Sequence, residues 1–338
     1  MKILVTGGAG YVGSHTCKAL AEAGHDVVVY DNLSTGHRDL IRWGDFFHGD
    51  IGDYSALVAC MKRYKPEGVI HFAAWSQVGE SVSDPGKYFK NNVAGTLNLL
   101  CAMRDQGLEA IVVSGTCAVY GEPKEQPITE KCPTNPINPY GASKLFMERM
   151  LADFEIAHGL RWMSLRYFNA AGADIAAETG ERHMPESHLI PRMFMAMDGS
   201  APPLQVFGDS YPTPDGTCIR DYVHVADLAT AHVTAIEHGL SGGQSAAVNL
   251  GTGKGLSVFE IIKAARDSLG KDAPYVVAAK RVGDPPILTA DYSLARTLLG
   301  WQPLCSDADS ILSSAWRWHE KDRPARNRLQ QASHANRR

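Results

Sequence analysis

Short apolar runs alternate with longer amphipathic stretches through the first two-thirds of the chain. The apolar runs are Ile3–Val5, Val27–Tyr30, Val69–Phe72 and Ile111–Val113. Strands that are separated by helices pair in parallel, because each return to the sheet needs a crossover connection. The runs are apolar at nearly every position, as expected when helices cover both faces of a sheet. This pattern predicts an α/β fold with a Rossmann-like, doubly wound parallel sheet.

The helical stretches between these runs are Tyr11–Ala23, Val82–Arg104 and Pro139–His158. After Asn169 the chain is rich in proline, glycine, glutamate and histidine, and helical patterns then return at Val225–Gly239, Val258–Leu269 and Ser293–Leu299. We therefore expect a smaller, discontinuous α+β lobe, with the segment 223–250 returning to the sheet. The basic segment 321–338 has the composition of a flexible tail.

Composition excludes several classes of protein. The 338 residues are 44% hydrophobic and 21% charged, as in a folded soluble protein larger than one domain of roughly 100–200 residues. The net charge of −4 disfavours nucleic acid and anionic membranes as partners. No apolar run approaches the roughly 18 residues of a membrane span, and the lead into the first glycine cluster is too short for a signal peptide.

The seven cysteines are widely spaced and include no C-x-x-C pair. An odd number of unpatterned cysteines is typical of free thiols in a reducing compartment. The sequence therefore predicts a cytoplasmic protein, and we predict no metal site.

A glycine-rich turn lies between the first predicted strand and the first predicted helix. Gly7, Gly8, Gly10 and Gly13 satisfy both G-x-G-x-x-G and the wider G-x-x-G-x-x-G. In this position backbone N–H groups and a helix N-terminus face a pyrophosphate. Asp31 follows the second strand, where a carboxylate binds ribose hydroxyls and repels a 2′-phosphate. The pattern favours NAD over NADP as a cofactor.

Polar residues also follow two other predicted strands. Asp50 either lies beside the adenine of such a cofactor or caps the next helix, and its spacing favours neither role. Thr116 lies just past Ile111–Val113, at the carboxyl edge of the sheet, where α/β proteins place their ligand-binding and catalytic residues. Its hydroxyl could bind a substrate oxygen, although a turn threonine is the commoner role at such a position.

Tyr140 and Lys144 are one turn apart at the start of a predicted helix, and therefore share a face. An ammonium beside a tyrosine lowers the phenol pKa and makes the phenolate a plausible base. A Y-x-x-x-K spacing is common by chance, so the argument depends on Thr116 and the glycine turn occurring with it.

Taken together, eight stretches resemble the extended short-chain dehydrogenase/reductase family, and within it the epimerases that act at C4 of UDP-hexoses. The stretches extend from residue 7 to 253, and the resemblance continues to about Trp301. They are GGAGYVGSH at 7–15, DNLSTG at 31–36, VGESV at 78–82, NNVAGTL at 91–97, YGASK at 140–144, LRYFNAAGA at 165–173, DGTCIRDYVHV at 215–225 and NLGTG at 249–253.

The resemblance implies a tightly held NAD that is reduced and reoxidised in each turnover while UDP-galactose and UDP-glucose interconvert through a 4-keto sugar. Thr116, Tyr140 and Lys144 would be catalytic. The cofactor would be held by Gly7, Gly10, Tyr11, Val12, Gly13, Asp31, Asn32, Asp50, Ile51, Phe72, Ala73, Asn91, Tyr140, Lys144 and Tyr167.

The resemblance also assigns the substrate. The UDP-sugar would contact Thr116, Asn169, His188, Leu189, Gln205, Phe207, Arg220, Arg281, Asp284 and Leu288. The chemistry suits these roles, since two arginines neutralise a diphosphate with forked donors, while Phe207 would stack on uracil. From its surroundings alone, however, Arg220 is more often a structural ion pair and His188 a surface histidine.

The resemblance further implies two lobes and a homodimer. An NAD-binding domain would comprise 1–172 and 222–251, and a nucleotide-sugar lobe 173–221 and 252–320. Apolar residues on the helical stretches 82–104 and 139–158 would form the dimer interface.

Two departures bear on function. Trp75–Gln77 stands where many of these epimerases place a lysine near the nicotinamide. Leu288 stands where hexose-specific members often have a large tyrosine, which leaves UDP-GlcNAc/UDP-GalNAc or UDP-pentose epimerisation as alternatives. A 4,6-dehydratase is disfavoured, because Cys117–Ala118 after Thr116 cannot move the required proton. An NAD-sensing regulator is also disfavoured, because it would not need Thr116, Tyr140 and Lys144 together.

Overall fold

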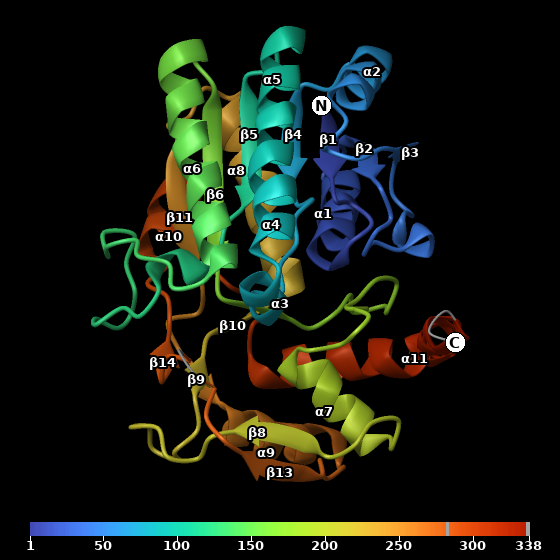
Figure 1. Cartoon of the computed structure of the whole chain (residues 1–338), viewed down its shortest axis with the longest axis vertical. Helices are drawn as coiled ribbons and strands as arrows, with labels where there is room; N and C mark the ends of the chain where they lie inside the picture. Colours follow the sequence, from blue (N-terminus) through green and yellow to red (C-terminus); the bar gives the residue numbers. More distant parts are fainter. Residues whose placement is uncertain (282–283, 336–338) are drawn as a thin grey trace.

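Seven parallel strands form one sheet in the computed structural model, which describes residues 1–281 and 284–335 (Figure 1). The strand order is β11-β6-β5-β4-β1-β2-β3, and each neighbouring pair is parallel. From β3 to β6 this is the order of a doubly wound Rossmann sheet, which confirms the predicted fold class. The strands are β1 (Lys2–Thr6), β2 (Asp26–Asp31), β3 (Asp45–His48), β4 (Gly68–His71), β5 (Ala110–Ser114), β6 (Arg161–Tyr167) and β11 (Ala246–Leu250).

Helices cover both faces of this sheet (Figure 1). On one face, α1 (Tyr11–Glu22), α8 (Val225–Leu240) and α10 (Ser293–Leu299) bury apolar side chains against the strands. On the other face α2 (Tyr54–Tyr64), α5 (Thr96–Gln106) and α6 (Pro139–His158) do the same. Each fully buried leucine contributes about 1.5–3 kcal/mol, so strands that are apolar on both sides require this two-sided cover.

The predicted helix Val82–Arg104 is not continuous. The chain forms α3 (Val78–Ser83), α4 (Pro85–Tyr88), a π-helical turn (Phe89–Gly95) and then α5. Pro85 begins a new helix because its ring cannot continue the preceding one. The Asn92 side chain binds both the N–H and the carbonyl of Trp75, at 2.9 and 3.0 Å. These two hydrogen bonds stabilise the π-helical turn. π-Helical turns are frequent at functional sites.

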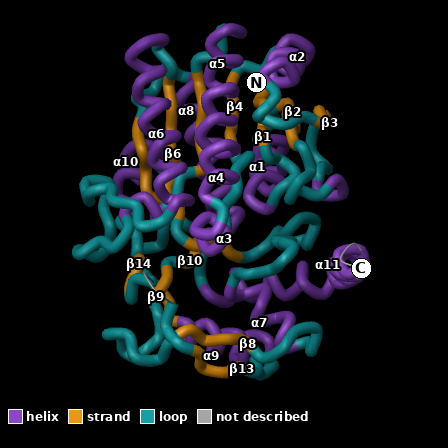
Figure 2. Tube along the Cα trace, viewed as in Figure 1, coloured by secondary structure: helices purple, strands orange, loops and turns teal. Residues whose placement is uncertain are grey.

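The second lobe is discontinuous and packs below the carboxyl edge of the sheet (Figure 2). Its core contains Phe194, Ile261 and Ile311, and its small sheets are β13-β8 and β12-β9-β14. A parallel pair, β7 (Asn169–Ala171) and β10 (Tyr222–His224), joins it to the main sheet lobe. The other elements are η1 (Arg38–Leu40), η3 (Cys117–Tyr120), α7 (Leu189–Met197), β8 (Leu204–Phe207), β9 (Ile219–Arg220), β12 (Leu256–Ser257), α9 (Val258–Leu269), β13 (Tyr275–Ala278), β14 (Ile287–Leu288) and α11 (Ala308–Ala335).

Two segments differ from the predicted lobe boundaries. Helix α10, expected in the second lobe, packs on the sheet, because Ala295 and Leu299 are apolar and meet the core beside α8. The expected flexible tail 321–338 is wrong for its first part, since α11 continues to Ala335. Asp322 in this helix is buried and pairs with Arg182, which holds the helix against the protein. Residues 336–338 of the predicted tail lie outside the described residues.

Among the described residues, no helix combines the length and the apolar character that crossing a bilayer requires.

Candidate active site

One cleft of about 920 Å³ lies at the carboxyl edge of the main sheet, between the two lobes. Residues at or just after the ends of β1, β2, β4, β5 and β6 line it, as expected for an open α/β sheet. Of the residues predicted to act in catalysis or binding, it is lined by Gly7, Gly10, Tyr11, Val12, Gly13, Asp31, Asn32, Ile51, Phe72, Ala73, Asn91, Thr116, Tyr140, Lys144, Tyr167, Asn169, His188, Arg220, Arg281, Asp284 and Leu288.

The missing side chains of the glycine turn let its backbone pack closely beside β4 and the N-terminus of α1. Gly7 has φ +76°, and a Cβ there would lie 2.6 Å from the Ala73 nitrogen. At Gly13 a Cβ would lie 2.2 Å from the Gly7 carbonyl oxygen. Gly10 caps α1 without a side-chain hydrogen bond, and the first turn carries no acidic residue. Unsatisfied N–H groups therefore face the cleft, and such a helix end suits the pyrophosphate of a dinucleotide.

Asp31 at the end of β2 is held by the backbone. Its carboxylate accepts hydrogen bonds from the N–H groups of Ala9 (3.0 Å) and Leu33 (2.8 Å). Burial raises the pKa of Asp31, and these two hydrogen bonds oppose the shift. Asp50 does not line the cleft, but its carboxylate accepts a hydrogen bond of 2.6 Å from Asn32. The arrangement suits the ribose hydroxyls of an adenosine.

Tyr140 and Lys144 lie at the start of α6, as the sequence predicts. Asn138 caps this helix, accepting a hydrogen bond from the Gly141 N–H at 2.9 Å. Lys144 is 3% exposed, and its ammonium donates to the Ser114 carbonyl at 2.9 Å. Thr116 caps η3, where its hydroxyl accepts from the Ala118 N–H at 3.2 Å. The three predicted catalytic side chains thus meet at the end of β5.

Burial is the largest cause of the pKa shifts of Tyr140 and Lys144. It raises the pKa of Tyr140 well above its ordinary value, and the neighbouring Thr116 hydroxyl opposes this shift. Burial also lowers the pKa of Lys144 to about 8, against the attraction of Glu148. The largest causes of the Tyr140 pKa shift are burial, Tyr167 and the Thr116 hydroxyl. A positive charge beside the phenol, such as the Lys144 ammonium in the same cleft, is what would bring the pKa of Tyr140 toward neutral pH.

Some predicted substrate residues pair with one another. Arg220 donates to Asp284 in an ion pair, the role that its surroundings in the sequence favoured. The guanidinium of Arg281 lies 3.9 Å from the Phe207 ring centroid. Leu189, Gln205 and Phe207 are absent from the cleft lining. Gln205 points outward on β8, whose side chains alternate between buried and exposed.

The structure also brings residues to the cleft that the sequence analysis did not select. Ser114, the last residue of β5, binds the Tyr167 hydroxyl. Trp75 lies under the Lys87 ammonium at 3.5 Å. Glu181 and His183 also line the cleft. The end of a predicted strand signalled Ser114, and Trp75 stands out in the sequence only for the lysine that it replaces. Only the density of Glu and His in 173–191 signalled Glu181 and His183.

Comparison with known proteins places this chain in a family. Residues 3–251 match the model of the NAD dependent epimerase/dehydratase family. A UDP-glucose 4-epimerase of Lacticaseibacillus casei is 49% identical over 95% of this chain and 97% of its own length.

Solved structures give the same result. A UDP-glucose 4-epimerase from Brucella ovis in complex with NAD is 54% identical with a TM-score of 0.92, over 94% of this chain and 98% of that one. A UDP-glucose-4-epimerase from Stenotrophomonas maltophila, with bound NAD and formylated UDP-arabinopyranose, is 39% identical with a TM-score of 0.93, over 96% and 99%.

Proposed function

The chain belongs to the NAD-dependent epimerase/dehydratase family, and from this membership and the cleft we propose that it is a UDP-glucose 4-epimerase. It interconverts UDP-galactose and UDP-glucose by inverting C4 through a transient 4-keto sugar. Its cofactor is NAD, which the family uses and which the similar Brucella structure contains. Such an activity serves galactose metabolism.

The observation that carries this proposal is that one cleft contains both a dinucleotide cradle and the three groups Thr116, Tyr140 and Lys144. The cradle comprises the uncapped N-terminus of α1 and the Asp31 carboxylate. A protein that only bound the dinucleotide would not need a half-buried tyrosine and a buried lysine one helical turn apart.

Bound NAD would supply the hydride acceptor for the sugar C4 and, as NADH, the hydride donor for the opposite face of the 4-keto sugar. Tyr140 removes the proton of the 4-hydroxyl and gives it back when the carbonyl is reduced. Thr116 donates or accepts a hydrogen bond at the same sugar oxygen. Lys144, held by the Ser114 carbonyl, binds the nicotinamide ribose and favours the phenolate through its charge.

The remaining side chains bind the two ligands. The residues near Asp31 hold the adenosine, and Phe72, Asn91 and Tyr167 lie along the rest of the cofactor. Arg220 and Arg281 would bind the diphosphate of the substrate, for which Arg220 has to exchange its Asp284 contact for phosphate oxygens. Asp284 would then accept a ribose hydroxyl.

The decisive experiment is proton NMR of the purified protein with UDP-galactose and no added NAD. We expect the anomeric signal of UDP-glucose to appear without net NADH. No conversion even after NAD is added would contradict the proposal, and a 4-keto-6-deoxy product would identify a dehydratase instead.

Leu288 supports a second activity. It lines the cleft, and a leucine leaves more room at the sugar 2-position than a tyrosine does. UDP-GlcNAc and UDP-GalNAc are therefore further substrates to test, as are UDP-pentoses, because the Stenotrophomonas relative holds a UDP-arabinopyranose derivative. Replacing Leu288→Tyr should abolish N-acetylhexosamine conversion and spare UDP-galactose. Failure of the parent protein to convert UDP-GlcNAc at high concentration would exclude this activity.

We further propose that the protein forms a homodimer. Exposed apolar side chains lie along α3, the π-helical turn, α5 and α6, which are neighbours in Figure 1. They are Val82, Phe89, Leu97, Phe146 and Ile156. A surface with so many large apolar groups favours burial against a second copy. Sedimentation that shows only monomer at micromolar concentration would refute the dimer.

We also propose a cytoplasmic location. All seven cysteines are free thiols. Persistent thiols are typical of a reducing compartment. Fractionation of the source cells would test this assignment.

A further inference from the structure

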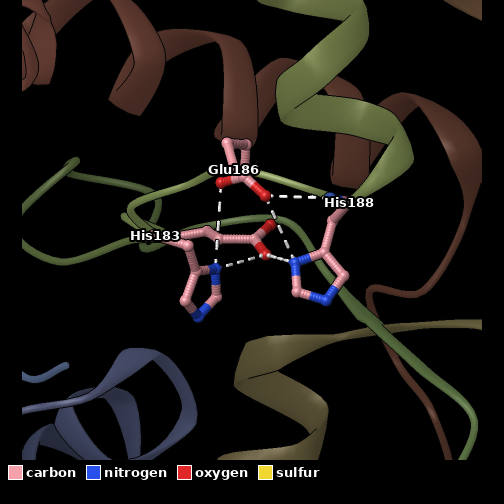
Figure 3. Close-up of side chains that lie close together, drawn as sticks. His183, Glu186 and His188 are labelled. Carbon is pink, nitrogen blue, oxygen red and sulfur yellow. Dashed lines mark hydrogen bonds and ion pairs between the residues drawn. The ribbon is translucent and has the colours of Figure 1, made fainter. Parts of the chain in front are cut away.

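Four side chains with metal-binding chemistry converge on the loop before α7. They are Glu181, His183, Glu186 and His188, and one ligand atom from each lies within 4.8 Å of all the others. Figure 3 shows the rings of His183 and His188 turned toward the same carboxylates. The proposed epimerisation uses only His188 of these four.

The histidine nitrogens lie 2.6–3.8 Å from the nearest carboxylate oxygens of the cluster. Nδ1 of His183 lies 3.1 Å from Oε1 of Glu181 and 3.8 Å from Oε2 of Glu186. Nδ1 of His188 lies 3.3 Å from the other Glu186 oxygen, Oε1. Ligands bound to zinc at about 2.0–2.1 Å are about 3.3 Å apart. The contact between His188 and Glu181, at 2.6 Å, is a hydrogen-bonding distance that a shared metal ion would lengthen.

The cluster is largely buried, so the charges of its two carboxylates have to be balanced within it. The carboxylate side chains of Glu181 and Glu186 are only 11% and 8% exposed. Nδ1 of His183 is buried and makes no well-formed hydrogen bond among the described residues. Without a metal, protonated His183 and His188 pair with the carboxylates. One divalent cation would balance the same two carboxylates, take neutral imidazoles as ligands and displace the two protons.

The surrounding chain holds the loop in place. Arg182 pairs with Asp39 and with Asp322 of α11, and the Trp318 indole donates to the Glu181 carbonyl at 2.9 Å. One oxygen of Glu186 accepts from the N–H groups of Ser187 and His188, at 2.8 and 2.9 Å. Ligands that are fixed by such second contacts are a feature of metal sites.

We propose that Glu181, His183, Glu186 and His188 form a binding site for a divalent transition metal of the zinc class. Two imidazoles with two carboxylates favour Zn²⁺ over Mg²⁺ and Ca²⁺, which prefer all-oxygen sites. The site borders the cleft through Glu181, His183 and His188, and His188 is 49% exposed there. The metal site is therefore accessible from the cleft. It lies beside the N-terminus of α1, because the His183 ring packs edge-on against Tyr11, the first residue of that helix.

The test uses the full chain, without an affinity tag, after dialysis against a chelator. Titration with Co²⁺ alone should produce the visible absorption of a tetrahedral complex, saturating at one equivalent per chain, and Zn²⁺ should displace it. Zn²⁺ should also raise the midpoint of thermal unfolding in a concentration-dependent way. Absence of the tetrahedral spectrum from the unmodified protein would overturn the proposal, whatever any variant does.

Variants then locate the site. His183→Ala and His188→Ala should each weaken Co²⁺ binding more than about tenfold, since each removes one of four ligands. His158→Ala removes an exposed histidine at the end of α6 and should bind as the parent does. A spectrum that persists unchanged in both ligand variants, with native circular dichroism, would contradict the assignment. The binding test involves neither NAD nor UDP-sugar, so its failure leaves the proposed epimerase activity in place.

Discussion

Gly141 of α6 lies directly against the Ala118 carbonyl oxygen of η3, so closely that a Cβ on Gly141 would be 2.5 Å from that oxygen. This contact brings the first turn of α6, with Tyr140, against the turn that begins at Thr116. The two proposed catalytic hydroxyls therefore owe their proximity to the absence of one methyl group.

Gly141→Ala should displace α6 from η3 and lower kcat, because a misplacement of about 1 Å costs on the order of 100-fold in rate. Gly86→Ala in α4 is the matched control, since its Cβ would meet nothing closer than 3.8 Å. Steady-state kinetics with UDP-galactose compare the two. Equal kcat values for both variants would show that the contact does not position Tyr140.

Tyr140→Phe should reduce kcat by about 10²–10⁴-fold, because it removes the proposed acid–base group, and leave the thermal midpoint nearly unchanged. Tyr64→Phe is the control, since Tyr64 packs beside Phe47 away from the cleft. The anomeric NMR assay gives both rates. A Tyr140→Phe enzyme with parental activity would remove Tyr140 from the mechanism.

Gly7→Ala should destabilise the protein and abolish NAD retention, because a Cβ would overlap the backbone of Ala73 at 2.6 Å. Gly24 has a similar φ of +81° with nothing within 4 Å, so Gly24→Ala should cost only about 1–2 kcal/mol of backbone strain. Bound NAD is measured after release by denaturation. NAD content that is equal in the two variants would argue against the proposed cradle.

Glu148→Gln should lower the free energy of unfolding by about 3–5 kcal/mol, because it leaves the buried Arg166 without its charged partner. The Glu109–Arg161 pair is much more exposed, 64% at the carboxylate, so Glu109→Gln should cost at most about 1 kcal/mol. Urea denaturation at pH 7.5 measures both variants. A small effect at Glu148 would mean that water or another acceptor compensates Arg166.

Stability should fall as the pH drops from about 6.5 toward 4. Burial lowers the pKa of His71 to about 3 and of His15 and His232 to about 4. The unfolded chain binds these protons more readily, so stabilisation present above pH 6.5 is lost on acidification, by about 1.4 kcal/mol per pH unit and proton. In urea titrations at several pH values, His232→Met should reduce the slope of the free energy of unfolding against pH by the contribution of about one proton. The exposed His158→Asn should leave this slope unchanged. Parallel curves for the parent and His232→Met would contradict the burial argument.

Much of the sheet lobe was predictable, because its signals are local. Apolar runs have the length of strands, Asn138 and Pro139 start α6 as their backbone preferences require, and the glycine turn needs a φ that few other residues adopt. The helix boundaries at Pro139–His158 and Val258–Leu269 agree with the structure for this reason. By contrast, the predicted helix across 82–104 is interrupted, because a tertiary contact of Asn92 with Trp75 competes with local preference.

The sequence by itself determined the fold class, the glycine turn of the proposed cofactor site and the spacing of Tyr140 and Lys144, since each depends on residues that are near one another along the chain. Only the tertiary structure decided that Arg220 pairs with Asp284, that α11 is held by Arg182, and that two glutamates and two histidines meet beside the cleft. These contacts join the ends of different elements, and their energies depend on burial and on distances of a few ångströms. No local pattern encodes such distances, because they are set by how the two lobes pack.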